Sequence, residues 1–85
     1  MKLTTYPNPA VNNVTVEYTL EHNATAVNLV IFDRTGKKVS ENNFSNQTAG
    51  TYKVNVDASK FAAGAYFYQL NVGGHNFTKQ LVITK

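Results

Sequence analysis

Residues 57–72, DASKFAAGAYFYQLNV, contain a turn signal, a buried strand and the start of a hairpin, and the rest of the chain is organised around them. Four large side chains recur in this stretch with period two, at Tyr66, Tyr68, Leu70 and Val72. That spacing places them on one face of an extended strand. Gly64 comes just before the run, where a glycine permits a positive φ or a close backbone approach.

A hairpin is predicted immediately after this strand. Val72 is followed by Gly73-Gly74 and then by a second apolar run that ends in Leu81-Val82-Ile83. Two strand-like runs on either side of Gly-Gly are typical of a β-hairpin with a primed turn. Lys79 interrupts the apolar alternation of the last strand, so we expect it near the rim of the core with its amine in water.

Upstream of residue 57 the chain shows further alternating runs. They predict strands at residues 14–20, 26–33, 37–44 and 52–56, followed by the final strand at 76–84. The run 26–33 is apolar on both faces, which predicts a central strand covered on both sides. The run 37–44 is polar and carries lysines, as expected of an edge strand.

The connections between these strands are predicted from turn chemistry. Asp33-Arg34-Thr35-Gly36 has an acceptor and a glycine where a hairpin needs them. Pro7-Asn8-Pro9 predicts an extended, edge-like turn, because proline lacks the amide hydrogen that a sheet ladder needs. Residues 45–50 are predicted to be a loop. Residues 57–61 are predicted to form one helical turn, with Asp57 or Ser59 accepting from free amides and Phe61 plugging the core.

The composition is that of a small β-rich module. The chain has 85 residues, room for one domain over 1–85, and it contains no cysteine for disulfides or thiolate metal sites. Only 15% of residues are charged, and the net charge of +3 is scattered, which does not predict nucleic-acid binding. No apolar run approaches the roughly 20 residues that span a bilayer, so no membrane insertion is predicted. The pattern as a whole predicts an all-β sandwich of about seven strands.

The residue pattern predicts no catalytic, cofactor or metal site. His22 and His75 fall in separate predicted loops, and Asp33 and Asp57 lie beside turns, where capping explains them. Phe67, Phe44 and Tyr6 are the rings expected to face solvent. Exposed rings leave a carbohydrate-binding or fibronectin-like accessory module as an alternative function. Five N-x-[ST] sequons are explained by Asn- and Thr-rich turns, at Asn13, Asn23, Asn43, Asn46 and Asn76.

Four segments, in order, resemble one known family. They are 6–9 (YPNP), 29–39 (LVIFD with GKKV), 56–66 (VDASKFAAGAY) and 77–85 (FTKQLVITK). Together they resemble the type A C-terminal sorting domain of the type IX secretion system of Bacteroidetes. The sequence departs from the family pattern at Ala62, where proline is frequent, and at Gln80, where a second lysine is common.

The resemblance implies a non-enzymatic sorting signal with an immunoglobulin-like fold. Such domains end secreted cargo proteins and direct them from the periplasm across the outer membrane through the type IX translocon. A sortase-like peptidase then usually removes the domain, and the cargo is secreted or attached to the cell surface. No cofactor is implied.

Two groups of residues are assigned roles on this basis. We expect the last strand and its end to form the recognised edge through Lys79, Leu81, Val82, Ile83 and Lys85. The other motif residues are expected to keep turns and core in order, at Pro7, Asn8, Pro9, Asp33, Gly36, Asp57, Gly64 and Tyr66.

Overall fold

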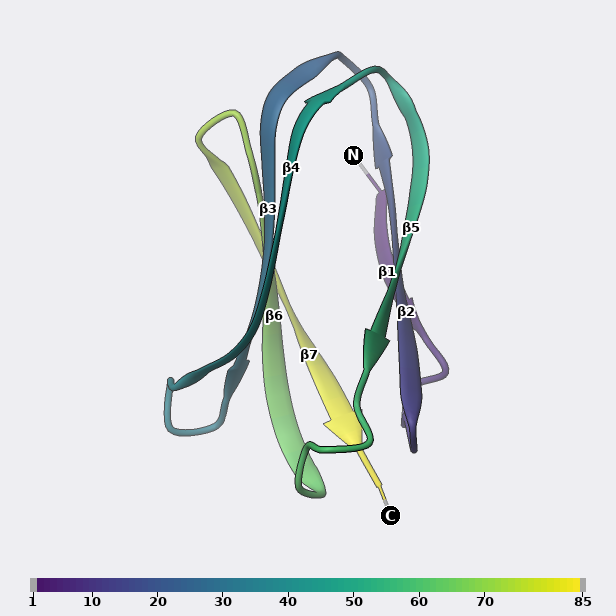
Figure 1. Cartoon of the computed structure of the whole chain (residues 1–85), viewed down its shortest axis with the longest axis vertical. Helices are drawn as coiled ribbons and strands as arrows, with labels where there is room; N and C mark the ends of the chain where they lie inside the picture. Colours follow the sequence, from purple (N-terminus) through teal and green to yellow (C-terminus); the bar gives the residue numbers. More distant parts are fainter. Residues whose placement is uncertain (1, 85) are drawn as a thin grey trace.

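The computed structural model describes residues 2–84, and within them the chain forms a sandwich of two antiparallel sheets (Figure 1). The strands are β1 (Lys2–Tyr6), β2 (Asn13–Leu20), β3 (Ala24–Asp33), β4 (Lys38–Gln47), β5 (Gly50–Asp57), β6 (Gly64–Val72) and β7 (His75–Ile83). One sheet has the order β1-β2-β5 and the other β4-β3-β6-β7. This arrangement, with β2 beside β5 in one sheet and β6 between β3 and β7 in the other, is that of an immunoglobulin-like sandwich. The predicted all-β fold is confirmed.

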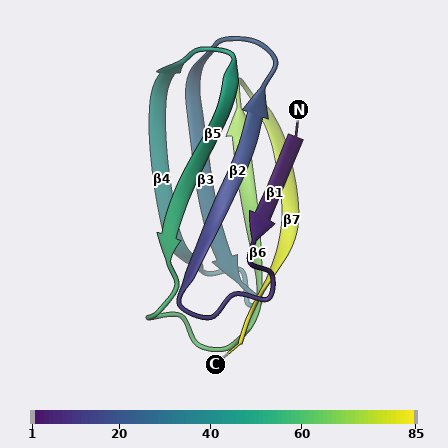
Figure 2. The ribbon, with the colours of Figure 1, turned by 90° about the vertical axis from the view of Figure 1, so that its right-hand side faces the viewer.

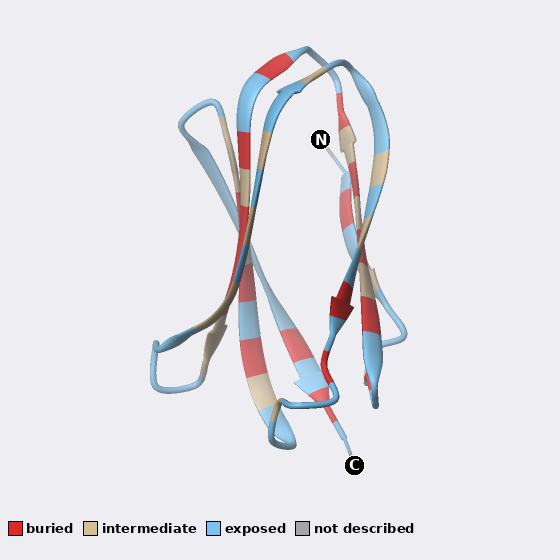
Figure 3. Cartoon of the chain, viewed as in Figure 1, coloured by how far each residue is buried: buried red, intermediate tan, exposed pale blue. Residues whose placement is uncertain are grey.

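The alternating runs bury the faces that the sequence predicts. In β2 every second residue from Val14 to Leu20 is buried, and in β6 Tyr66, Tyr68 and Leu70 are buried in the same way (Figure 3). These faces meet between the two sheets, and their apolar area supplies the main stabilising free energy.

Strand β3 lies at the centre of the larger sheet, between β4 and β6. Its inner face buries Val27, Leu29 and Ile31 almost completely. On the outer face Val30 is also buried, and the residues opposite it in the neighbouring strands are Glu41 and Gln69. Side chains of adjacent strands therefore cover this part of the outer face.

Both predicted hairpin turns are present. Gly73 and Gly74 have φ angles of 53° and 88°, which side chains with a β-carbon rarely adopt, and they join the paired residues Val72 and His75. At the β3–β4 turn the Asp33 carboxylate accepts hydrogen bonds from the backbone amides of Thr35, at 2.9 Å, and Lys37, at 3.0 Å. Asp33 thus holds the turn closed, as the sequence indicates.

The loop predicted at residues 45–50 is wrong. Strand β4 continues to Gln47 and β5 begins at Gly50, so only two residues lie between the strands. The strand was not predicted because this region is polar and shows no apolar alternation. In the structure Gln47 pairs with Ala24, and its side chain accepts a hydrogen bond from the Tyr18 hydroxyl at 2.6 Å. The edge position predicted for this strand is confirmed.

Three smaller predictions are also corrected. Residues 57–61 form no helical turn; the Phe61 amide donates to the Ala58 carbonyl at 3.0 Å, which closes a β-turn. Phe44 faces the core, because it lies opposite Val27 in the ladder, whereas Phe67 and Tyr6 are exposed as predicted. A strand, β1, precedes the Pro7-Asn8-Pro9 turn and pairs with β2.

Candidate recognition site

The residues predicted to carry recognition lie in the second half of β7, where the strand alternates between core and solvent. Leu81 and Ile83 are 0% and 1% exposed and pack in the core, whereas Val82 is 37% exposed on the outer face. Lys85, the last residue of the predicted set, lies outside the described residues. This half of the strand therefore offers a partner the Val82 side chain, while Leu81 and Ile83 anchor the strand in the core.

The outer edge of this end of β7 is paired with the N-terminal proline motif. The Asn8 side-chain oxygen accepts a hydrogen bond from the Val82 amide at 3.2 Å. The Ala10 amide donates to the Val82 carbonyl at 2.9 Å, and the Thr84 amide donates to the Ala10 carbonyl at 2.8 Å. We call Asn8 and Ala10 together the clasp. No periodicity in the sequence predicts this contact, because the partners are more than seventy residues apart.

The rest of the same edge is open. In an antiparallel ladder the amide and carbonyl of one residue point to the same side, and successive residues alternate. Since Val82 and Thr84 point outward to the clasp, Thr78 and Gln80 point outward too. Among residues 2–84 no backbone hydrogen bond reaches Thr78 or Gln80 on that side. We call this stretch of β7, from Asn76 to Gln80, the open edge.

Lys79 lies within the open edge and links the two sheets. Its ammonium donates to the Leu3 carbonyl of β1 at 2.6 Å. Lys79 is exposed, as predicted, and its amine also bonds to β1, which lies close enough to accept it (Figure 2). The predicted set of residues did not include Leu3, since a backbone acceptor leaves no sequence signal.

The motif residues before β6 build a corner of the sandwich. The Tyr66 hydroxyl donates to the Ala62 carbonyl at 2.6 Å, and the Tyr66 ring stacks on Phe61 with centroids 5.5 Å apart. A tyrosine at the start of this strand that bonds to backbone just upstream is the tyrosine corner of immunoglobulin-like sandwiches. Asp57 accepts a hydrogen bond from the Ser59 amide at 3.0 Å, so it is a local acceptor as predicted, although it does so beside a β-turn and not at a helical turn.

The segments that the resemblance singled out meet at one end of the molecule. The clasp contacts Val82 and Thr84, and the Ala58 amide donates to the Asn12 carbonyl at 2.8 Å. A hollow of about 230 Å³ lies between the turn that begins at Asp33 and the segment 62–66. This end also holds the end of β7 (Figure 1). We call it the motif end.

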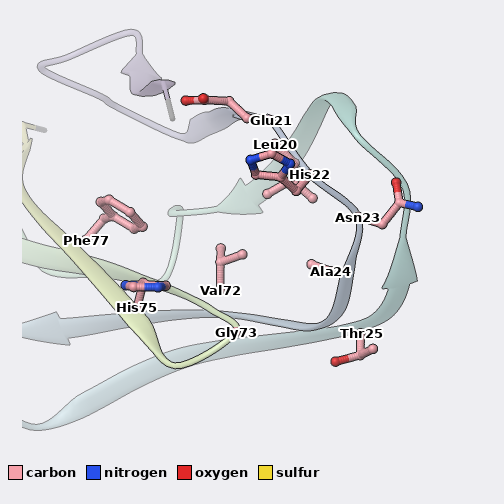
Figure 4. A pocket seen from close by; sticks show the side chains of 10 residues that line it. All are labelled: Leu20, Glu21, His22, Asn23, Ala24, Thr25, Val72, Gly73, His75 and Phe77. Atoms are coloured by element: carbon pink, nitrogen blue, oxygen red, sulfur yellow. The ribbon is translucent and has the colours of Figure 1, made fainter.

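A second hollow, larger than the first, lies elsewhere on the sandwich, and both histidines line it. His22, from the β2–β3 connection, and His75, from the start of β7, both line it (Figure 4). The sequence places them 53 residues apart in separate loops, so their proximity was not predicted. Over residues 2–84 no group of three His, Cys, Asp or Glu side chains is arranged to hold a metal ion.

The described part of the chain has no helix of the length and apolarity that crossing a membrane requires.

Comparison with known proteins identifies the family. The family model described as "Secretion system C-terminal sorting domain" matches residues 4–84. No curated protein matches the chain. Domains of this family are the C-terminal sorting signals of type IX secretion. They follow a cargo protein and act with the type IX machinery. The proteins that carry them are exported and are secreted or attached to the cell surface, so the carbohydrate-binding alternative is not favoured. The chain belongs to the family of secretion system C-terminal sorting domains.

Proposed function

We propose that residues 1–85 act as a non-catalytic sorting domain whose last strand is the element recognised by the secretion machinery. In this proposal a strand of the type IX translocon pairs with the open edge of β7 by backbone hydrogen bonds. Lys79 and Lys85 orient the partner through charge, Val82 contacts it on the outer face, and Leu81 and Ile83 hold the strand in place.

One observation supports the proposal most directly: the outward amides and carbonyls of Thr78 and Gln80 have no backbone partner within residues 2–84. An unpaired strand edge is a template for pairing with another chain. The neighbouring end of the same edge is occupied by the clasp, which limits the template to the open edge.

The partners follow from the same proposal. The translocon meets the folded domain at the open edge, and a sortase-like peptidase then separates the domain from the cargo that precedes it. Cleavage falls upstream of the sandwich, because β1 starts at Lys2 and pairs with β2 from its first residue.

A proline placed on the outward side of β7 tests the pairing. The Gln80 amide points away from β6, so Gln80→Pro removes no bond of the β6–β7 ladder, and proline is tolerated at such edge positions. We expect Gln80→Pro to fold, with an unchanged far-ultraviolet circular dichroism spectrum, and to reduce export of a fused fluorescent reporter at least tenfold.

Gln80→Ala is the matched control, because it removes the same side chain and keeps the amide. We expect it to export at the level of the unmodified domain. Normal export of folded Gln80→Pro would refute pairing at the open edge, while the family assignment would stand.

A further inference from the structure

A hollow of about 420 Å³ lies between the β2–β3 connection and the β6–β7 hairpin. It is lined by Leu20 and Val72 and also by His22, His75 and Phe77 (Figure 4). Leu20 is buried, whereas Phe77 keeps 37% of its surface exposed. The hollow therefore presents an aromatic ring and aliphatic side chains to solvent, with imidazoles among them.

The hollow exists because the two sheets differ in extent. Phe77 lies opposite the fully buried Leu70 in the ladder, so its ring points to the inner side of the larger sheet. Directly opposite residues of an antiparallel pair share a face. The smaller sheet ends with β1 on this side, and the bond from Lys79 to the Leu3 carbonyl spans the remaining gap. Phe77 therefore keeps 37% of its surface exposed although it lies on the inner side.

The direction of β1 points to what fills this space. Lys2 is paired with Thr19 of β2, and Leu3 with Tyr18, so β1 runs away from the end of β2. A polypeptide that continued β1 backwards in the same register would pass Leu20 and enter the hollow. Its alternate side chains would share the inward face of Leu3 and Leu20 and would approach Phe77.

A sorting domain at the C-terminus of a protein has its cargo attached ahead of β1. We infer that the segment joining the cargo to this domain docks in the hollow as an extended strand, continuing β1 and placing apolar side chains at alternate positions over Phe77. The docked segment covers the exposed ring and fixes the path by which the cargo leaves the sandwich. This inference rests on the family assignment and is independent of the pairing proposed for β7.

The test uses a reporter protein joined to residues 1–85 by a short linker of alternating valine and threonine. Hydrogen exchange of the linker amides is measured on the purified fusion, together with nuclear Overhauser contacts between the linker valine methyls and Phe77. We expect the linker amides nearest Lys2 to exchange at least about tenfold more slowly than those of an unstructured peptide. We also expect valine contacts to the Phe77 ring.

Two substitutions of exposed phenylalanines distinguish docking over Phe77 from the effect of losing any exposed ring of this sheet. Phe77 is 37% exposed and Phe67 is 41% exposed, but Phe67 lies on the outer face of the same sheet, away from the hollow. Phe77→Ser is expected to abolish the linker protection, and Phe67→Ser is expected to leave it unchanged. Unprotected linker amides in the unsubstituted fusion, or protection that survives in folded Phe77→Ser, would overturn the inference. Because no translocon is present, neither result depends on how β7 is recognised.

Discussion

At the scale of single residues, the corner before β6 shows why particular residue types occupy the motif. Gly64 has a φ of 151°, a conformation that residues with a β-carbon rarely adopt, and a β-carbon added there would meet no atom within 4 Å. The glycine is therefore required by backbone conformation and not by crowding. Tyr66, two residues later, ties the corner to the Ala62 carbonyl.

Gly64→Ala should lower the free energy of unfolding by about 1–3 kcal/mol, because alanine is strained at this φ. Urea unfolding followed by circular dichroism measures the change. Ala63→Ser, at the exposed neighbouring position, serves as the control and should stay within about 0.5 kcal/mol of the unmodified protein. Equal stabilities of the two variants would contradict a conformational role for Gly64.

Asp33 makes stability depend on acid pH. The hydrogen bond from the Thr35 hydroxyl, and then those from the amides of Lys37 and Thr35, lower the pKa of the Asp33 carboxyl below its ordinary value. A carboxyl whose pKa is lowered in the folded state stabilises the fold above its unfolded pKa, near 3.9, and loses that contribution as the pH falls further.

Asp33→Asn should therefore unfold at a lower urea concentration than the unmodified protein at pH 7, and the difference should shrink as the pH falls from about 4 towards 2. Unfolding midpoints across this range measure it. A gap between the two proteins that is the same at pH 7 and pH 2 would show that the carboxylate charge is not what holds the turn.

At the scale of elements, β7 combines a buried anchor with an exposed edge. Leu81→Ala removes a fully buried side chain and should cost about 2–5 kcal/mol of unfolding free energy, measured by urea unfolding. Val82→Thr, one residue further and exposed, should cost far less. A similar loss at both positions would contradict the register of β7 against β6.

Some elements could be predicted from the sequence because burial is one-sided. Local residue patterns determine these elements: apolar residues recur with period two in β2 and β6, and two glycines form the turn at Gly73-Gly74. The last residues of β4 could not be predicted from the sequence, because the composition of a polar strand at a sheet edge is the same as that of a loop. In the candidate site the strand was predicted, but the clasp and the bond from Lys79 to Leu3 were not, since both use backbone groups distant in sequence.

At the scale of the whole molecule, the end of β7 with its clasp and the start of β1 with its hollow lie at different ends of the sandwich. The motif end gathers the turn at Asp33, the tyrosine corner and the clasp around the end of β7 (Figure 1). The large hollow lies away from this end, where β1 begins. A cargo joined ahead of β1 therefore leaves the sandwich at a distance from the clasp, and the open edge of β7 stays accessible to a partner.

The most direct test of the central claim is the export of a fluorescent reporter with an N-terminal signal peptide and residues 1–85 at its C-terminus. The host is a bacterium with a type IX secretion system, compared with the same strain lacking a working translocon. We predict that the reporter is released or displayed on the surface only when the translocon works, and that it stays in the periplasm otherwise. Periplasmic retention of the folded fusion in both strains would contradict the sorting function of this chain.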